Sequence, residues 1–216
     1  MRWPLAFLLF LSACFPAAVR PIPVRSIGQG SVPLYFLPGR YSRAADFVKQ
    51  GFELPNGQDG VSVVFIDAHM GYYRQKVVMD ALEEVIGDTH PSIKVGGISL
   101  GGFGAVMYAR RHADQVRELV LFSPFLGDKA FLDRVKVGDD VRDSDSELGK
   151  ELFACWAFLK ETKIPVRLYC GEQDDFAPLL HFLETEAPNI KVHWLPGGHD
   201  WPTWKIMWLN YFSQTP

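Results

Sequence analysis

The sequence has 216 residues, a formal net charge of −3 at pH 7 and 48% hydrophobic residues, all ordinary values for a globular protein. Because one domain usually takes about 100–200 residues, we expect a single domain over residues 21–216. No stretch concentrates lysine or arginine, so neither nucleic acid nor an anionic membrane surface is expected as a partner.

The first twenty residues differ from the rest and are typical of an export signal followed by a linker. Arg2 precedes the apolar run Trp3–Leu11, which is shorter than the ~20 residues that a membrane-spanning helix needs. The tetrad Leu11-Ser12-Ala13-Cys14 resembles the bacterial lipoprotein signal, in which the cysteine is lipidated and becomes the new N-terminus. We therefore predict a lipid anchor at Cys14. Cleavage near Ala18 and an uncleaved anchor remain the alternatives.

The residue after the predicted lipidation site bears on localisation. It is Phe15, not the aspartate that such signals use for retention in the inner membrane. The expected place is the periplasmic face of the cell envelope, at the outer membrane rather than the inner one.

Two further cysteines, Cys155 and Cys170, either pair in an oxidising compartment or stay as buried free thiols. The sequence has no C-x-x-C pair and no His/Cys cluster at metal-binding spacing. No metal and no organic cofactor are therefore expected.

Past the linker, short apolar runs alternate with stretches of helical spacing, which predicts a parallel sheet covered by helices on both faces. The strand candidates are Val32–Leu37, Val61–Ile66, Ile93–Ile98, Leu119–Phe122, Val166–Cys170 and Lys191–Leu195. The helix candidates are Tyr73–Ile86, Gly102–Arg111, Leu148–Lys160, Ala177–Glu186 and Pro202–Phe212. The predicted fold class is α/β: a three-layer α/β/α sandwich with a sheet of about six strands. The acidic segment 127–149 interrupts this alternation and is expected to be a solvated polar loop or a small cap.

The third strand candidate leads into Gly97-x-Ser99-x-Gly101, and a helix candidate follows. In this context the motif places the serine on a strained turn, with its hydroxyl clear of the sheet. Glycine is needed at 97 and 101 because a side chain there would collide with the neighbouring elements. Ser99 is therefore the candidate nucleophile, and its turn is the candidate nucleophile elbow.

A serine hydroxyl needs a base at neutral pH, and that base needs a carboxylate to orient it. His199 is the candidate base because it follows the last strand candidate and two glycines. Asp174 is the candidate acid after the fifth strand, and its neighbour Asp175 is the alternative. The resulting order, Ser99, Asp174, His199, is that of α/β-hydrolases.

Two backbone N–H groups are candidates for binding an oxyanion. Leu100 follows the nucleophile at the start of its helix, and Arg40 lies in the loop after the first strand. Tyr72, Tyr73, Phe125, Phe176 and Trp201 flank the predicted catalytic loops. They either line an apolar substrate pocket or belong to the core.

The segments Gly97–Gly104, Gly171–Asp174 and Gly197–Trp201 together resemble the α/β-hydrolase superfamily, above all its small esterases related to esterase D. The resemblance runs from about Val32 to Phe212 and implies a carboxylic-ester hydrolase. Two features depart from the family. Pro38-Gly39 stands where His-Gly is usual, and the two antiparallel strands that often open the fold are missing or vestigial.

The expected partner is a small-molecule or lipid ester; no oligomeric state is predicted. One alternative keeps the chemistry and acts on thioesters, acetylated sugars, lipids or peptides. The other is an envelope lipoprotein that uses the fold only for binding, because fold alone does not guarantee activity.

Overall fold

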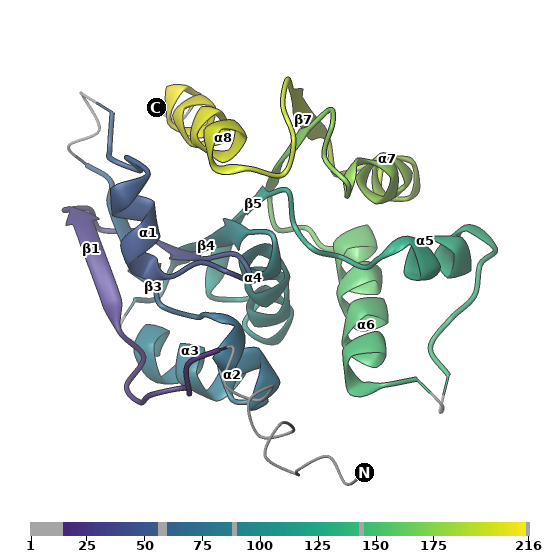
Figure 1. The fold of residues 1–216 in the computed structure, drawn as a ribbon, viewed down its shortest axis with the longest axis horizontal. Helices are drawn as coiled ribbons and strands as arrows, with labels where there is room; N and C mark the ends of the chain where they lie inside the picture. Colours follow the sequence, from purple (N-terminus) through teal and green to yellow (C-terminus); the bar gives the residue numbers. More distant parts are fainter. Residues whose placement is uncertain (1–14, 56–59, 88–89, 143–144, 215–216) are drawn as a thin grey trace, which may run out of the picture.

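The computed structural model describes residues 15–55, 60–87, 90–142 and 145–214 (Figure 1). These residues form a seven-stranded sheet with the order β1-β3-β2-β4-β5-β6-β7. The strands are β1 (Val24–Gly28), β2 (Pro33–Leu37), β3 (Ser62–Ile66), β4 (Ile93–Ile98), β5 (Val116–Phe122), β6 (Val166–Gly171) and β7 (Val192–Leu195). β1 runs antiparallel to β3, and the other neighbouring pairs are parallel, which confirms the predicted mostly parallel sheet.

Helices cover both faces of the sheet (Figure 1). They are α1 (Ala44–Lys49), α2 (Met70–Arg74), α3 (Val78–Ile86), α4 (Leu100–Arg111), α5 (Lys129–Lys136), α6 (Glu147–Glu161), α7 (Ala177–Glu186) and α8 (Trp201–Ser213). Phe47 of α1 and Trp208 of α8 belong to the core on one face. The core on the other face is built with side chains of α3, α4, α6 and α7. The three predicted layers are present.

The parallel register brings several loops to one edge of the sheet. Ile98 at the end of β4 lies opposite Phe122 of β5, and Phe122 lies opposite Tyr169 of β6. Gly171 at the end of β6 lies opposite Leu195 at the end of β7. The loops that follow these strands therefore emerge together at the carboxyl edge, where open α/β sheets usually bind ligands.

Of the two opening antiparallel strands that were expected to be missing or vestigial, one is present as the five-residue edge strand β1. Buried and exposed residues do not alternate along β1, because all of its residues are exposed except the half-buried Ile27. An edge strand buries little, so its sequence needs few apolar residues and gives little periodic signal.

The predicted single helix Tyr73–Ile86 is two helices, α2 and α3. α2 ends in a Schellman motif: the N–H of Lys76 donates to Tyr73 and that of Val77 to Tyr72. Lys76 carries the left-handed conformation, at φ 58°. Glycine usually marks this position, and a lysine there gives no sequence signal.

The segment 127–149 contains helix α5, so it is the small cap and not a plain loop. Asp128 caps α5 by accepting the N–H of Phe131 at 2.9 Å. Arg134, in the last turn of α5, forms ion pairs with two residues beyond the helix, Asp139 at 2.7 Å and Asp145 at 2.8 Å. The Arg134 hydrogen bond is the main cause that lowers the pKa of both carboxyls. Asp128, Asp139 and Asp145 therefore help to hold the fold of this segment.

Cys155 and Cys170 are buried free thiols, which decides between the two alternatives. Burial raises the pKa of each thiol to about 12. Because the thiolate is the reactive form, neither cysteine should react with maleimide in the folded protein at neutral pH. Both should react in guanidinium chloride, as counted by mass spectrometry of tryptic peptides. Labelling of the native protein at either cysteine would contradict the described burial.

The predicted signal, the lipid anchor at Cys14 and the cleavage motif lie outside the described residues. Among the residues that are described, none of the helices is long and apolar enough to cross a membrane.

Candidate active site

Ser99 lies on the sharp turn between β4 and α4, with φ 53° and ψ −116°. A non-glycine residue in this region carries about 1–3 kcal/mol of strain, which the surrounding structure must hold in place. A Cβ at Gly97 would lie 2.5 Å from the backbone of Gly101, and one at Gly101 would lie 2.3 Å from the carbonyl oxygen of Leu37. Both glycines therefore let the turn pack against β2.

His199 reaches the serine from the loop between β7 and α8. Its Nε2 lies 3.0 Å from Ser99 Oγ. Backbone and side-chain hydrogen bonds fix the loop, since Gly197 donates to the Gln173 side chain at 2.8 Å and its carbonyl accepts from Gln173 N–H at 2.9 Å. The ring of Phe176 lies edge-on to the imidazole at 4.8 Å. The base is thus held between the acid loop and α8.

Asp174 completes a hydrogen-bonded chain, because its Oδ2 lies 2.8 Å from Nδ1 of His199. Its Oδ1 accepts the backbone N–H of Phe176 at 2.9 Å. Burial raises the pKa of this carboxyl, but the hydrogen bonds from His199 and Phe176 outweigh burial, so its pKa lies below the ordinary value. Asp175 is exposed and lines a neighbouring cavity, so the geometry favours Asp174.

The two candidate oxyanion donors belong to segments that adjoin the serine. Leu100 is the first residue of α4, whose N-terminus directs N–H groups and a partial positive charge toward the turn. A Cβ at Gly39 would lie 3.6 Å from Ser99 Cβ, so the loop that carries Arg40 packs directly on the nucleophile. Ser42 closes that loop by donating its N–H to the Gly39 carbonyl at 3.1 Å.

The remaining histidines have other partners. His69 is buried, accepts the N–H of Gly71 at 3.1 Å and packs on the ring of Tyr72. Burial lowers the pKa of His69. His193 stacks on Tyr169, and burial lowers its pKa too.

Next to the site, Ser123 is absent from the predicted set, and Phe125, predicted as a pocket or core residue, makes a backbone contact that was not predicted. Ser123 follows β5 at φ 43°, is fully buried, and helps to lower the pKa of Asp174. Phe125 donates its N–H to the Ser99 carbonyl at 2.9 Å, and its ring contacts that of Phe176. The only available signal is their place after a strand that ends at the carboxyl edge.

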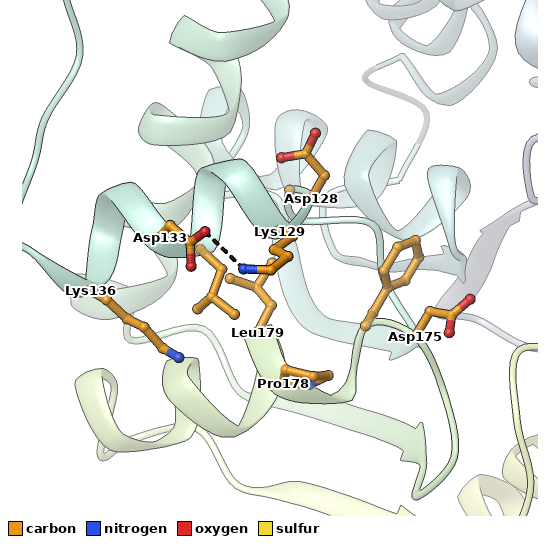
Figure 2. Close-up of a pocket in the computed structure, with 10 residues that line it drawn as sticks. Asp128, Lys129, Asp133, Lys136, Asp175, Pro178 and Leu179 are labelled. Carbon is orange, nitrogen blue, oxygen red and sulfur yellow. Dashed lines mark hydrogen bonds and ion pairs between the residues drawn. The ribbon is translucent and has the colours of Figure 1, made fainter.

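A cavity of about 460 Å³ adjoins the site between α5 and the start of α7. Figure 2 shows Lys129, Asp133 and Lys136 from α5 facing Pro178 and Leu179 of α7, with Lys129 paired to Asp133. Phe176 lines the cavity and also contacts His199, so it forms the wall between them. Tyr72 is instead fully buried in the core.

The residues that the structure describes contain no group of three or more His, Cys, Asp or Glu side chains that could hold a metal ion.

The sequence matches no protein-family model and no curated protein. The fold, however, matches many solved structures. A Paleococcus ferrophilus monoacylglycerol lipase aligns over 89% of this chain and 97% of its own, with a TM-score of 0.64 and 17% identity. A thioesterase domain of the curacin pathway aligns over 89% of this chain and 93% of its own, with a TM-score of 0.64 and 16% identity. Staphylococcus aureus S-formylglutathione hydrolase aligns over 87% of this chain and 82% of its own, with a TM-score of 0.58 and 17% identity. The chain therefore has the α/β-hydrolase fold.

Proposed function

We propose that this protein is a serine hydrolase that cleaves carboxylic esters through an acyl-enzyme. One observation carries the proposal: the continuous hydrogen-bonded chain from Ser99 Oγ through His199 to Asp174. The strained turn at Ser99 and the buried, ionised Asp174 support it further.

In the proposed first half-reaction, Ser99 Oγ attacks the ester carbonyl carbon while its proton passes to Nε2 of His199. Asp174 holds the imidazole in the required tautomer and stabilises the charge that forms on it. The N–H groups of Leu100 and Arg40 bind the oxyanion. The carbon–oxygen bond then breaks, and the alcohol leaves with the proton from His199.

In the second half-reaction, His199 removes a proton from water, and the hydroxide attacks the acyl group on Ser99. The acid leaves, and the proton returns from His199 to Ser99 Oγ. Neither half-reaction needs a metal or an organic cofactor. The direct test is reaction with a fluorophosphonate probe, which should attach one adduct to the peptide that contains Ser99. No adduct on the folded wild-type chain would favour a non-catalytic binding protein.

We propose that the cavity between α5 and α7 takes the acyl chain of the substrate. Leu132 and Leu179 are buried residues of its lining, and Phe176 connects it to His199. The printed names of the similar structures include a thioesterase and a monoacylglycerol lipase, so the panel of substrates should include thioesters and glycerol esters.

Filling this cavity should shorten the preferred acyl chain. We expect Leu132→Trp to lower kcat/KM for p-nitrophenyl octanoate by about tenfold or more, because each methylene in an apolar pocket contributes strongly to discrimination. Activity on the acetate ester should stay within about twofold. Leu209→Trp, at an exposed position of α8, is the matched control. Equal loss on both esters would contradict an acyl site here.

We also propose that the protein is lipid-anchored at Cys14 on the periplasmic face of the envelope. Cys14→Ser should move the protein from the membrane fraction to the soluble fraction, as followed by immunoblotting. Palmitate incorporation that persists in this variant would contradict the anchor.

A further inference from the structure

Four side chains from three distant segments form one column on the surface, here called the rim cluster: Phe15, Arg40, Tyr41 and Arg74. The rings of Phe15 and Tyr41 stack, with centroids 5.9 Å apart and an interplanar angle of 20°. The guanidinium of Arg40 lies 5.1 Å from the Tyr41 ring centroid, and that of Arg74 lies 5.7 Å from the Phe15 centroid. Tyr41 is 78% exposed, so the column faces solvent.

The rim cluster lies at the mouth of the candidate active site. Arg40 and Tyr41 directly follow Gly39, where a Cβ would lie 3.6 Å from Ser99 Cβ. On the other side, Tyr73 precedes Arg74 and donates its hydroxyl to the Leu100 carbonyl at 3.2 Å. The loop that carries Arg40 and Tyr41 and the helix α2 that carries Arg74 therefore both contact the turn or the helix of the nucleophile.

The segment between Phe15 and β1 is held against the domain by several hydrogen bonds and an ion pair. The hydroxyl of Tyr72 donates to the Val19 carbonyl at 2.8 Å and accepts the Val19 N–H at 3.2 Å. Arg20 pairs with Glu84 of α3 at 2.7 Å, and the Pro23 carbonyl accepts the N–H of Asp67 at 2.8 Å. Figure 1 shows the start of the described chain running beside α2 and α3 before it enters β1. The described chain therefore begins, at Phe15, beside the active-site mouth.

The charges of the rim cluster favour an anionic surface. Arg43 pairs with Asp67 and Arg20 pairs with Glu84, whereas within the described residues no carboxylate pairs with Arg40 or Arg74. Exposed aromatic rings next to arginines are typical of side chains at a membrane–water interface. The sequence contains no basic run, so this surface forms only when the three segments converge.

We propose that the rim cluster rests on a lipid bilayer with anionic headgroups, so that the active-site mouth faces the membrane and takes ester lipids from it. The proposal rests on the proposed hydrolase function and on the anchor at Cys14. Only one peptide bond separates Cys14 from Phe15, so a lipid on Cys14 would hold the rim cluster close to the bilayer. A lipid anchor holds a protein at a surface, and the two arginines add an electrostatic attraction to anionic headgroups that favours this orientation.

The orientation can be tested on the full lipidated chain in vesicles of phosphatidylethanolamine and phosphatidylglycerol. An environment-sensitive fluorophore on Gln75→Cys, beside Arg74, should emit at shorter wavelength and resist an aqueous quencher. The matched control is Lys163→Cys, an exposed residue before β6 at the opposite edge of the sheet, and its label should remain fully quenchable. Equal quenching of the two labels would overturn the proposal, because the mouth would then not face the bilayer.

A second measurement separates this proposal from the hydrolase function. Arg74→Ala should lower hydrolysis of a diacylglycerol in these vesicles by about fivefold at low salt, and Arg74→Lys should retain most of it. Hydrolysis of soluble p-nitrophenyl acetate should be the same in both variants. If the wild-type protein does not hydrolyse the soluble ester at all, the hydrolase function itself is refuted. Unchanged vesicle activity in Arg74→Ala, with soluble activity intact, would refute only the membrane contact.

Discussion

Replacing Ser99 with alanine should lower kcat/KM for short p-nitrophenyl esters by a factor of about 10⁴ to 10⁶. The alanine keeps the backbone turn but removes the oxygen that lies 3.0 Å from His199 Nε2. The residual rate would come from the oxyanion-binding N–H groups and from substrate binding alone. Esterase assays with purified protein, paired with fluorophosphonate labelling, measure this loss.

The control for this prediction is Ser213→Ala at the end of α8, where the hydroxyl bonds only to the local Asn210 carbonyl. It should leave kcat/KM unchanged. Circular dichroism should give the same spectrum for Ser99→Ala and for the wild type, which separates lost chemistry from lost folding. Full turnover in a folded Ser99→Ala variant would refute the nucleophile assignment.

Replacing Asp174 with asparagine should lower kcat by a factor of about 10⁴ while KM changes little. An amide beside Nδ1 stabilises the imidazole tautomer that cannot accept the serine proton. Asp175→Asn is the matched control, since its side chain is exposed and adjacent in sequence. A larger loss in Asp175→Asn than in Asp174→Asn would reverse the assignment of the acid.

The same substitution should change how stability depends on pH. The pKa of Asp174 is lower in the folded state, so its contribution to stability is present above the ordinary aspartate pKa of about 3.9 and is lost as the pH falls below it. The unfolding free energy of the wild type should therefore fall more steeply between about pH 5 and pH 2 than that of Asp174→Asn. Urea titrations at several pH values measure this difference.

The sequence predicted the parallel sheet because buried strands are continuous apolar runs, which periodicity detects well. It also placed Ser99, Asp174 and His199 at strand ends, where the parallel register now brings them together. The choice between Asp174 and Asp175 depended on which carboxylate turns inward, and no local pattern encodes that. The structure distinguishes them by burial.

The elements that sequence reasoning missed share a physical cause. β1 buries little, α1 is only six residues long, and α5 depends on the ion pairs of Arg134. Short or exposed elements carry little periodicity because they are stabilised by contacts distant in sequence. The rim cluster is the extreme case, since Phe15 meets Tyr41 only in the folded chain.

The position of His199 ahead of α8 has a consequence for biogenesis. The residue after it, Asp200, caps α8 through the N–H of Thr203, and α8 supplies Trp204, Met207, Trp208, Tyr211 and Phe212 to the core under one face. A nascent chain that has emerged only as far as β7 has the nucleophile and the acid but neither the base nor that core. Hydrolytic activity should therefore appear only after α8 has left the ribosome and docked, which would keep an exported precursor inactive during its synthesis.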